Sequence, residues 1–149
     1  MMNFAKCLLV VTLLFSSAFA RCGVAEDANA VVETWSAAYS SNEPDRIVGN
    51  YWPDAILLGT VSPVMSEGTA AIQQYFSAVK GTGNKNTLGN RRTIVLSDDA
   101  AVVTGFYTFT RMSEGQPAPR PSRFTMLVVK RGSEWRIAHH HSSPHVQPN

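Results

Sequence analysis

All four histidines of this sequence lie in one short C-terminal segment, His139 to His145, and two serines stand among them. Imidazole changes its charge near neutral pH, so it can accept or donate a proton, and it can also ligate a metal ion. A serine hydroxyl beside it supplies a hydrogen-bond partner. This segment is therefore the part of the chain that offers the most chemistry.

Three interpretations of the histidine segment compete. An exposed, polar strand end would give these side chains no functional role. A zinc site could use His139 and His141, although the sequence fixes no third protein ligand. A pocket for a small molecule would use an imidazole to move a proton, with Ser143 as its hydrogen-bond partner. We favour the pocket, and we expect neither a metal ion nor a cofactor in it.

Side-chain alternation predicts which histidines face the pocket, because successive residues of a strand point to opposite sides of a sheet. Trp135 and Ile137 are large and apolar, so their side of the last strand is expected to face the core. His140 and Ser142 are then expected on the outer side. The inward side carries three polar residues: His139, His141 and Ser143.

Covalent catalysis by these serines is not indicated. Ser142 and Ser143 stand close to histidines in the sequence, but a strand directs nearest neighbours to opposite faces. The chain has no G-x-S-x-G motif of the kind that presents a nucleophilic serine. It also has neither a GxGxxG nor a Walker A motif, so no nucleotide cofactor is implied.

Helices are predicted in the first half of the chain. Apolar residues recur at helical spacing over residues 27–41, with Asp27 as the N-cap. A short helix is expected after Pro44, and a third helix is expected to begin at a Thr69 cap. Between these two helices, residues 55–58 are predicted to form a short buried strand.

The second half of the chain favours strands, because it is rich in Val, Thr, Phe and Tyr. Residues 113–121 contain three prolines and are predicted to be an irregular connection, since proline cannot donate to a ladder. The order of elements predicts an α+β fold: a cone-shaped, curved antiparallel sheet around the N-terminal helices, with a pocket inside the cone. The strands are expected at residues 92–97, 100–112, 122–130 and 134–142.

Residues 1–20 have the pattern of a secretory signal peptide: a basic start, an apolar run too short to span a membrane comfortably, and Ala18-Phe19-Ala20. We therefore expect a single mature domain of residues 21–149 that is secreted or periplasmic. A lipoprotein acylated on Cys22 is the alternative, but Arg21 stands where such sites have a small residue. After cleavage Cys22 would be the only cysteine, so no internal disulfide could form.

Composition limits the partners. The chain has 149 residues, of which 44% are hydrophobic, which suits one domain with its own core. Its formal charge of +2 is small and its basic residues are scattered, so neither nucleic acid nor an anionic membrane is an expected partner.

Five short segments together resemble a known family. They are PDAILLGTVS at 53–62, QYF at 74–76, YTF at 107–109, RFT at 123–125 and WRIAHHHSS at 135–143. In this order the set resembles the association domain of calcium/calmodulin-dependent protein kinase II as found in stand-alone bacterial proteins. That domain lies in the nuclear transport factor 2-like (SnoaL-like) superfamily. Within it, the chain is most similar to the iota-class carbonic anhydrases.

The resemblance implies a conical α+β domain that forms a homodimer or larger homo-oligomer. It also implies reversible hydration of carbon dioxide to bicarbonate without a metal. The implied catalytic residues are Thr60, Tyr75, His141 and Ser143, with His141 as the base. The expected substrate-binding residues are Ser62, Arg123 and His139. A register change of one residue would put His140 and Ser142 in place of His141 and Ser143.

The sequence departs from the carbonic anhydrase pattern at three points. Residues 144–148, PHVQP, stand where a Met-Pro is expected after the two serines. Pro63 replaces an expected asparagine, and no second cysteine occurs around residues 96–98.

Two other functions use the same fold. One is a non-enzymatic oligomerisation and ligand-binding module. The other is a SnoaL-like enzyme acting on an organic substrate, which would need an acidic base inside the cone, and Asp54 and Glu67 are the candidates. In either case self-association is expected through the apolar outer face of the sheet, with Phe106 and Val128 as contact residues.

Overall fold

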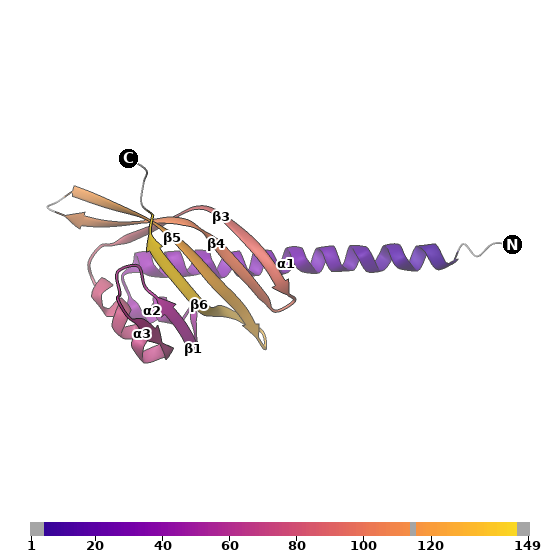
Figure 1. Ribbon diagram of the computed structural model, residues 1–149, viewed down its shortest axis with the longest axis horizontal. Coiled ribbons are helices and arrows are strands. Elements are labelled where there is room, and N and C mark those ends of the chain that lie inside the picture. The colour runs from indigo at the N-terminus through magenta and orange to yellow at the C-terminus, as the bar shows by residue number, and fades with distance from the viewer. Residues whose placement is uncertain (1–4, 114–115, 146–149) are drawn as a thin grey trace.

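The computed structural model describes residues 5–113 and 116–145, with side chains from residue 23 onwards. Its helices are α1 (Ala5–Ser41), α2 (Pro44–Val48) and α3 (Gly68–Phe76), and a 3-10 turn, η1 (Ser77–Val79), follows α3. The strands are β1 (Tyr51–Leu58), β2 (Met65–Glu67), β3 (Lys85–Ser97), β4 (Ala100–Ser113), β5 (Gln116–Arg131) and β6 (Glu134–Pro144). The predicted α+β fold is therefore confirmed (Figure 1).

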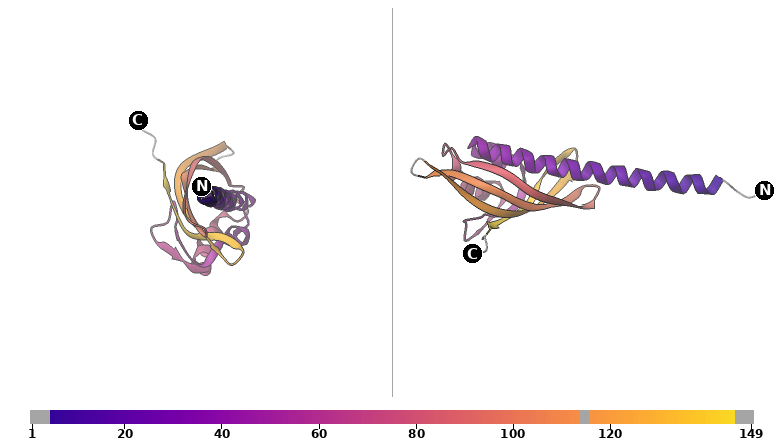
Figure 2. Two further views of the ribbon diagram at one scale, coloured as in Figure 1. Left: turned by 90° about the vertical axis from the view of Figure 1, so that its right-hand side faces the viewer. Right: turned by 90° about the horizontal axis from the view of Figure 1, so that it is seen from above.

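The strands form one six-stranded sheet in the order β2-β1-β6-β5-β4-β3. It is mixed, not antiparallel as predicted, because β1 runs parallel to its neighbour β6. The helices between β1 and β3 carry the chain across to the far edge of the sheet. The sheet curves around α1, which lies along its concave face (Figure 2). The core fills the space between them, with Trp35 of α1 almost fully buried at its middle.

Two predicted helix starts are wrong. Asp27 lies inside α1, because the helix continues without a break from Ala5 and no residue in between stops it. The N-cap of α3 is Glu67, so Thr69 lies in the first turn. The proposed signal peptide and Cys22 lie outside the residues whose side chains are described. Among the described residues, none of the helices is long and apolar enough to cross a membrane.

The prolines of residues 113–121 lie in a strand, not in the predicted irregular connection. They occupy alternate positions of β5 and pair with β4 alone, because β6 reaches β5 only as far as Ser122. In an antiparallel strand the N–H and C=O of one residue point the same way. The Pro121 carbonyl accepts a hydrogen bond from the His145 N–H at 2.9 Å, on the side away from β4. The three prolines therefore lack an N–H only on the side away from β4, so the β4–β5 ladder loses no hydrogen bond. They are Pro117, Pro119 and Pro121.

A bulge interrupts β6. Ile137 pairs with Val128 and His139 pairs with Leu127, so Ala138 has no partner in β5. The parallel ladder to β1 is irregular at the same point, where Tyr51 pairs with Ile137 and Ile56 with His139. An extra residue of this kind reverses the alternation of every side chain that follows it.

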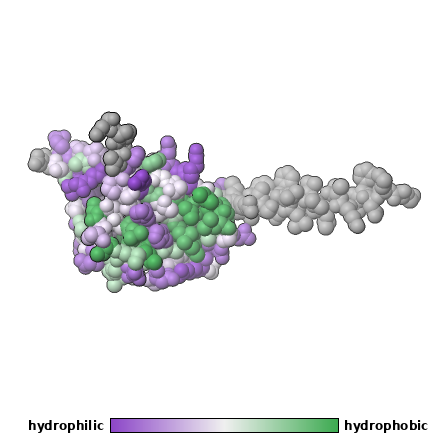
Figure 3. All heavy atoms as spheres, viewed as in Figure 1, coloured by the Kyte–Doolittle hydropathy of each residue, from purple (hydrophilic) through white to green (hydrophobic). Residues whose placement is uncertain are grey.

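The outer face of the sheet is partly apolar. Ile94 and Leu96 of β3 are 55% and 58% exposed, and Phe106 of β4 is 44% exposed. Apolar side chains gather over the β3–β4 hairpin (Figure 3). Val128, which we expected on this face, is fully buried in the core because it has the same parity as Phe124 and Met126.

Gly105 of β4 is required by the close approach of β3, which bulges between Leu88 and Arg91. A Cβ at this position would lie 2.4 Å from the Asn90 carbonyl oxygen and 2.7 Å from the Arg91 Cα, and backbone cannot give way cheaply. We expect Gly105→Ala to lower the free energy of unfolding by about 1–3 kcal/mol in urea denaturation. Gly49→Ala is the control, because its Cβ would approach no atom closer than 3.4 Å. Equal stability of the two variants would contradict this assignment.

Candidate functional site

A cavity of about 250 Å³ lies inside the cone, between α1, α3 and the concave face of the sheet. Its walls are largely aromatic, and its polar groups come mainly from the loop after β1 and from β4, β5 and β6. The aromatic lining residues are Trp35, Tyr39, Tyr75, Phe76, Tyr107 and Phe109. Cavities with apolar walls and a few placed polar groups are typical sites for small molecules.

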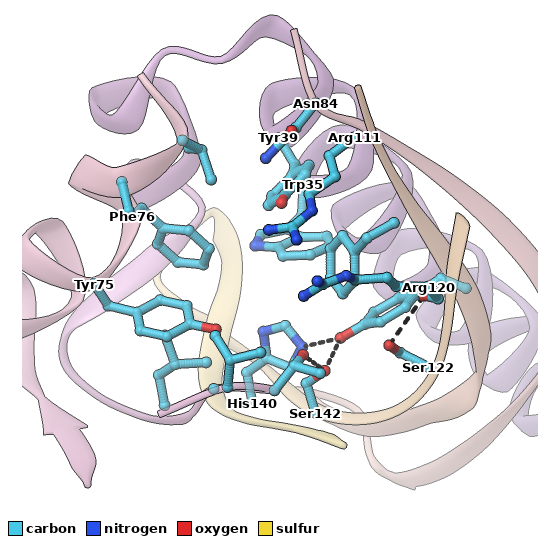
Figure 4. A pocket seen from close by; sticks show the side chains of 18 of the residues that line it. Trp35, Tyr39, Tyr75, Phe76, Asn84, Arg111, Arg120, Ser122, His140 and Ser142 are labelled. Atoms are coloured by element: carbon cyan, nitrogen blue, oxygen red, sulfur yellow. Dashed lines mark hydrogen bonds between the residues drawn. The ribbon is translucent and has the colours of Figure 1, made fainter. Parts of the chain in front are cut away.

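The bulge at Ala138 decides which histidine reaches this cavity. His140 and Ser142 point inwards and are 1% and 5% exposed. The prediction that His141 and Ser143 face the interior is wrong, because it assumed unbroken alternation from Ile137. The alternative register, with His140 and Ser142 inside, is the one that the structure has (Figure 4).

His141 and Ser143 meet Arg123 on the outer face. The three residues line a shallow hollow together with hydroxyls of β4 and β5, and the Arg123 Nε donates a hydrogen bond to the Ser143 Oγ at 3.0 Å. His139 has the same parity as His141, and burial together with the nearby His141 lowers its pKa. Ser62 donates to the Val64 carbonyl in the loop after β1 and does not line the cavity. The predicted substrate-binding set is therefore not in the cavity.

Thr60 and Tyr75 do line the cavity. Thr60 follows the end of β1, and Tyr75 comes from α3 and crosses directly over Gly59. A Cβ on Gly59 would lie 2.3 Å from the Tyr75 ring, so only glycine allows the ring to lie there. Burial raises the pKa of Tyr75, while hydrogen bonds to Val61 and Thr60 partly oppose this rise.

A continuous hydrogen-bonded network runs under the cavity. The Trp35 indole N–H donates to the Tyr51 hydroxyl at 2.8 Å, and that hydroxyl lies 2.8 Å from His140 Nδ1. On the other side of the ring, His140 Nε2 lies 3.3 Å from the Tyr107 hydroxyl. Tyr107 donates to Ser142 at 2.5 Å, and Ser142 contacts the Thr60 hydroxyl.

Three of these network residues, Trp35, Tyr51 and Tyr107, were not predicted as site residues from the sequence. Tyr107 entered only as part of a strand and of the YTF segment. The signal that could have indicated them is a buried aromatic residue with a polar end, which needs a hydrogen-bond partner in the core.

Burial, together with a smaller effect of the neighbouring His139 and His141, lowers the pKa of His140 to about 3. The imidazole is therefore neutral at physiological pH and is a weak base. Burial also raises the pKa of Tyr51 and of Tyr107. The network is thus a set of uncharged donors and acceptors.

Positive charge at the site comes from Arg111 and Arg120, which both line the cavity. Figure 4 shows the two guanidinium groups directed towards the same space as Tyr75 and His140. None of the lining residues described is acidic. Asp54 lies elsewhere, in a pair with Arg131 at 2.8 Å, and Glu67 is exposed in β2. The described residues contain no group of three His, Cys, Asp or Glu that could hold a metal ion.

Comparison with known proteins gives one family match. The model of the calcium/calmodulin dependent protein kinase II association domain matches residues 25–146. No curated protein matches the sequence.

Solved structures with the same fold include a calcium/calmodulin dependent protein kinase II association domain protein from Xanthomonas campestris. It is 34% identical to this chain, with 78% of this chain and 84% of that one covered and a TM-score of 0.74. The kinase hub homology domain of Chlamydomonas reinhardtii is 18% identical, with 83% and 99% covered and a TM-score of 0.71. A scytalone dehydratase-like protein from Novosphingobium aromaticivorans is 12% identical, with 87% and 89% covered and a TM-score of 0.78.

The buried His140 predicts a specific pH dependence of stability. Its pKa is lowered on folding, so the unfolded chain takes up the proton first, and stability is lost as the pH falls from about 6.5 towards about 3. Between about pH 7 and about pH 5 we expect the wild type to lose about 2 kcal/mol more stability than His140→Gln does. Urea denaturation across this range measures the difference.

The matched control for this prediction is His141→Gln on the outer face, which should keep the wild-type pH dependence. His140→Gln is expected to be less stable than the wild type at every pH, since it breaks the network, so only the slope against pH is informative. A His140→Gln variant with an unchanged slope would contradict the assignment.

Proposed function

Because this chain belongs to the calcium/calmodulin-dependent protein kinase II association-domain family, we propose that it is a self-associating module whose cavity binds a small organic anion. The family part of the resemblance seen in the sequence is confirmed by the match and by the 34% identical relative. The comparisons lend no support to the carbonic anhydrase subgroup. The observation that carries the proposed ligand is the pair of arginines over an aromatic cavity whose described lining residues include no acidic one.

The chemistry of the lining residues favours a carboxylate. A guanidinium group binds a carboxylate through paired, charge-assisted hydrogen bonds. The aromatic walls would cover the apolar part of the ligand, and the small volume of the cavity limits its size. Hydroxyls of Thr60 and Tyr75 are placed to supply further hydrogen bonds at the floor.

The outer face of the sheet is the proposed surface of self-association. The family is one of association domains, and the outer face carries Ile94, Leu96 and Phe106 exposed to solvent. Exposed apolar side chains gathered in one place are typical of a protein–protein interface. Burying them against a second copy would remove this surface from water.

Carbon dioxide hydration is the second candidate function. In its favour, Thr60, Tyr75, His140 and Ser142 line one cavity and could hold bicarbonate and water. Against it, His140 is 1% exposed, both of its ring nitrogens have partners, and its pKa of about 3 makes it a poor general base. A SnoaL-like acid–base reaction has less support, because Asp54 and Glu67 do not line the cavity.

Export remains a proposal as well. We propose that residues 1–20 direct the chain out of the cytoplasm and are then removed. The family match begins at residue 25, after this segment, and is compatible with its removal.

The ligand proposal is tested with benzoate as a probe. We expect benzoate to bind the wild type measurably in isothermal titration calorimetry, and benzyl alcohol, which lacks the charge, to bind at least tenfold more weakly. The double variant Arg111→Gln and Arg120→Gln should lose about tenfold or more in affinity for benzoate, since each removes a charge-assisted hydrogen bond. Arg92→Gln on the outer edge of the sheet is the control. Equal binding by both variants would refute the role of the two arginines.

Self-association is tested by light scattering at micromolar protein concentration. We expect the wild type to be a dimer or larger, and Ile94→Asp to shift it towards the monomer, because a charge would be buried in the interface. Val61→Asp is the control, since Val61 is also exposed but lies in the loop after β1. A wild type that is monomeric throughout would contradict the proposed interface.

A further inference from the structure

The Trp35 ring lines the cavity and Tyr51 lies behind it, and the series of hydrogen bonds that begins with these two residues ends at the cavity wall. Both side chains are almost fully buried, at 1% and 3% exposed. Apolar packing alone does not explain why two core positions carry an indole N–H and a phenol hydroxyl. Their hydrogen bonds give a reason.

The first two bonds fix the tautomer of His140. An indole N–H can only donate, so the Tyr51 oxygen is an acceptor towards Trp35 at 2.8 Å. The single Tyr51 proton is then left for His140 Nδ1, at 2.8 Å, which must accept it. A neutral imidazole whose Nδ1 accepts carries its own proton on Nε2.

The next bonds carry this direction to the cavity. His140 Nε2–H donates to the Tyr107 oxygen at 3.3 Å, and Tyr107 donates to Ser142 at 2.5 Å. The Ser142 oxygen accepts from Tyr107, so its proton goes to the Thr60 oxygen. Each hydroxyl has one proton, and each uses it in the same direction.

This chain of hydrogen bonds ends in a hydroxyl proton at the cavity wall. The Thr60 oxygen accepts from Ser142, so the Thr60 proton is available to a ligand. If Thr60 donates to the adjacent Tyr75 hydroxyl instead, the Tyr75 proton is available to the ligand. With the opposite direction, the same two residues would present lone pairs. The direction set by Trp35 therefore changes which ligand groups the cavity accepts.

We propose that Trp35 and Tyr51 are positioning residues that fix the direction of this hydrogen-bond chain, so that Thr60 and Tyr75 donate to the ligand and the cavity selects an acceptor oxygen, as in a carboxylate or carbonyl. This inference rests on the proposed ligand-binding function for the identity of the site. It adds that ligand selection is determined in part by two groups that bond to one another and not to the ligand, the Trp35 indole N–H and the Tyr51 hydroxyl.

The direction of the hydrogen-bond chain is measured first, on the wild type and without any ligand. Two-dimensional ¹H–¹⁵N NMR of the histidine rings at neutral pH distinguishes a protonated from an unprotonated ring nitrogen. We expect His140 to be a single tautomer, with its proton on Nε2. In Tyr51→Phe the constraint on Nδ1 is lost, and a mixture of tautomers is expected. A wild-type His140 with its proton on Nδ1 would overturn the inference.

The effect on binding is measured second, again with benzoate. Tyr51→Phe should weaken benzoate binding roughly tenfold, because the donor at the cavity wall is no longer held in place. The matched control is Ser36→Ala, which removes a buried, hydrogen-bonded hydroxyl from α1 that neither lines the cavity nor belongs to the chain of bonds. Unchanged binding by Tyr51→Phe, with its tautomer altered, would refute the selection of acceptors.

The two proposals fail in different ways. If the wild type binds no benzoate, the proposed function is wrong and the selection of acceptors is wrong with it, whatever the tautomer. If the wild type binds benzoate but His140 carries its proton on Nδ1, the proposed function stands and only the direction of the chain is refuted.

Discussion

A polar ring at the centre of a hydrophobic core must have its nitrogens paired, because an unpaired polar group there costs free energy comparable to a lost hydrogen bond. His140 is such a ring, and the elements around it meet this requirement from three directions. Tyr51 of β1 and Tyr107 of β4 pair with its two ring nitrogens, and Trp35 of α1 donates to Tyr51 and packs edge-on against the ring. The same side chains therefore pack the sheet against α1 and form the polar network, so loss of either would disturb the other.

The irregularity of β6 makes this arrangement possible. Ile137 is fully buried in the core, and without a bulge the next inward residue would be His139. The unpaired Ala138 shifts the inward position by one, which brings His140 to the phenol hydroxyls and leaves His139 and His141 on the outer side. The outer polar residues, including Arg123, then meet in a hollow of their own. A single inserted residue thus separates two polar sites that the sequence presents as one.

The α+β architecture, most strand positions and the inward direction of Ile137 could be derived from the sequence, because they follow from periodicity and composition. The side-chain direction after Ala138 could not, since a bulge depends on pairing with Val128 and Leu127 in another strand. The β5 extension was missed for a similar reason: its prolines are acceptable only because β6 ends before them. Likewise, Arg111 and Arg120 are far from the histidines in sequence and meet them only through the β4–β5 ladder. In each case the missing information is which strand lies alongside.

The cavity combines a neutral, hydrogen-bonded floor with aromatic walls and two arginines at its edge. This combination suits binding of a small anion better than proton transfer, since the buried imidazole holds its partners tightly and is a weak base. The most direct test is a crystal structure of the protein grown with benzoate. We predict density for the carboxylate within hydrogen-bonding distance of Arg111 or Arg120 and of the Thr60 or Tyr75 hydroxyl, with His140 still between Tyr51 and Tyr107. Benzoate bound only in the outer hollow beside Arg123 and His141, with the cavity occupied by water, would contradict the account.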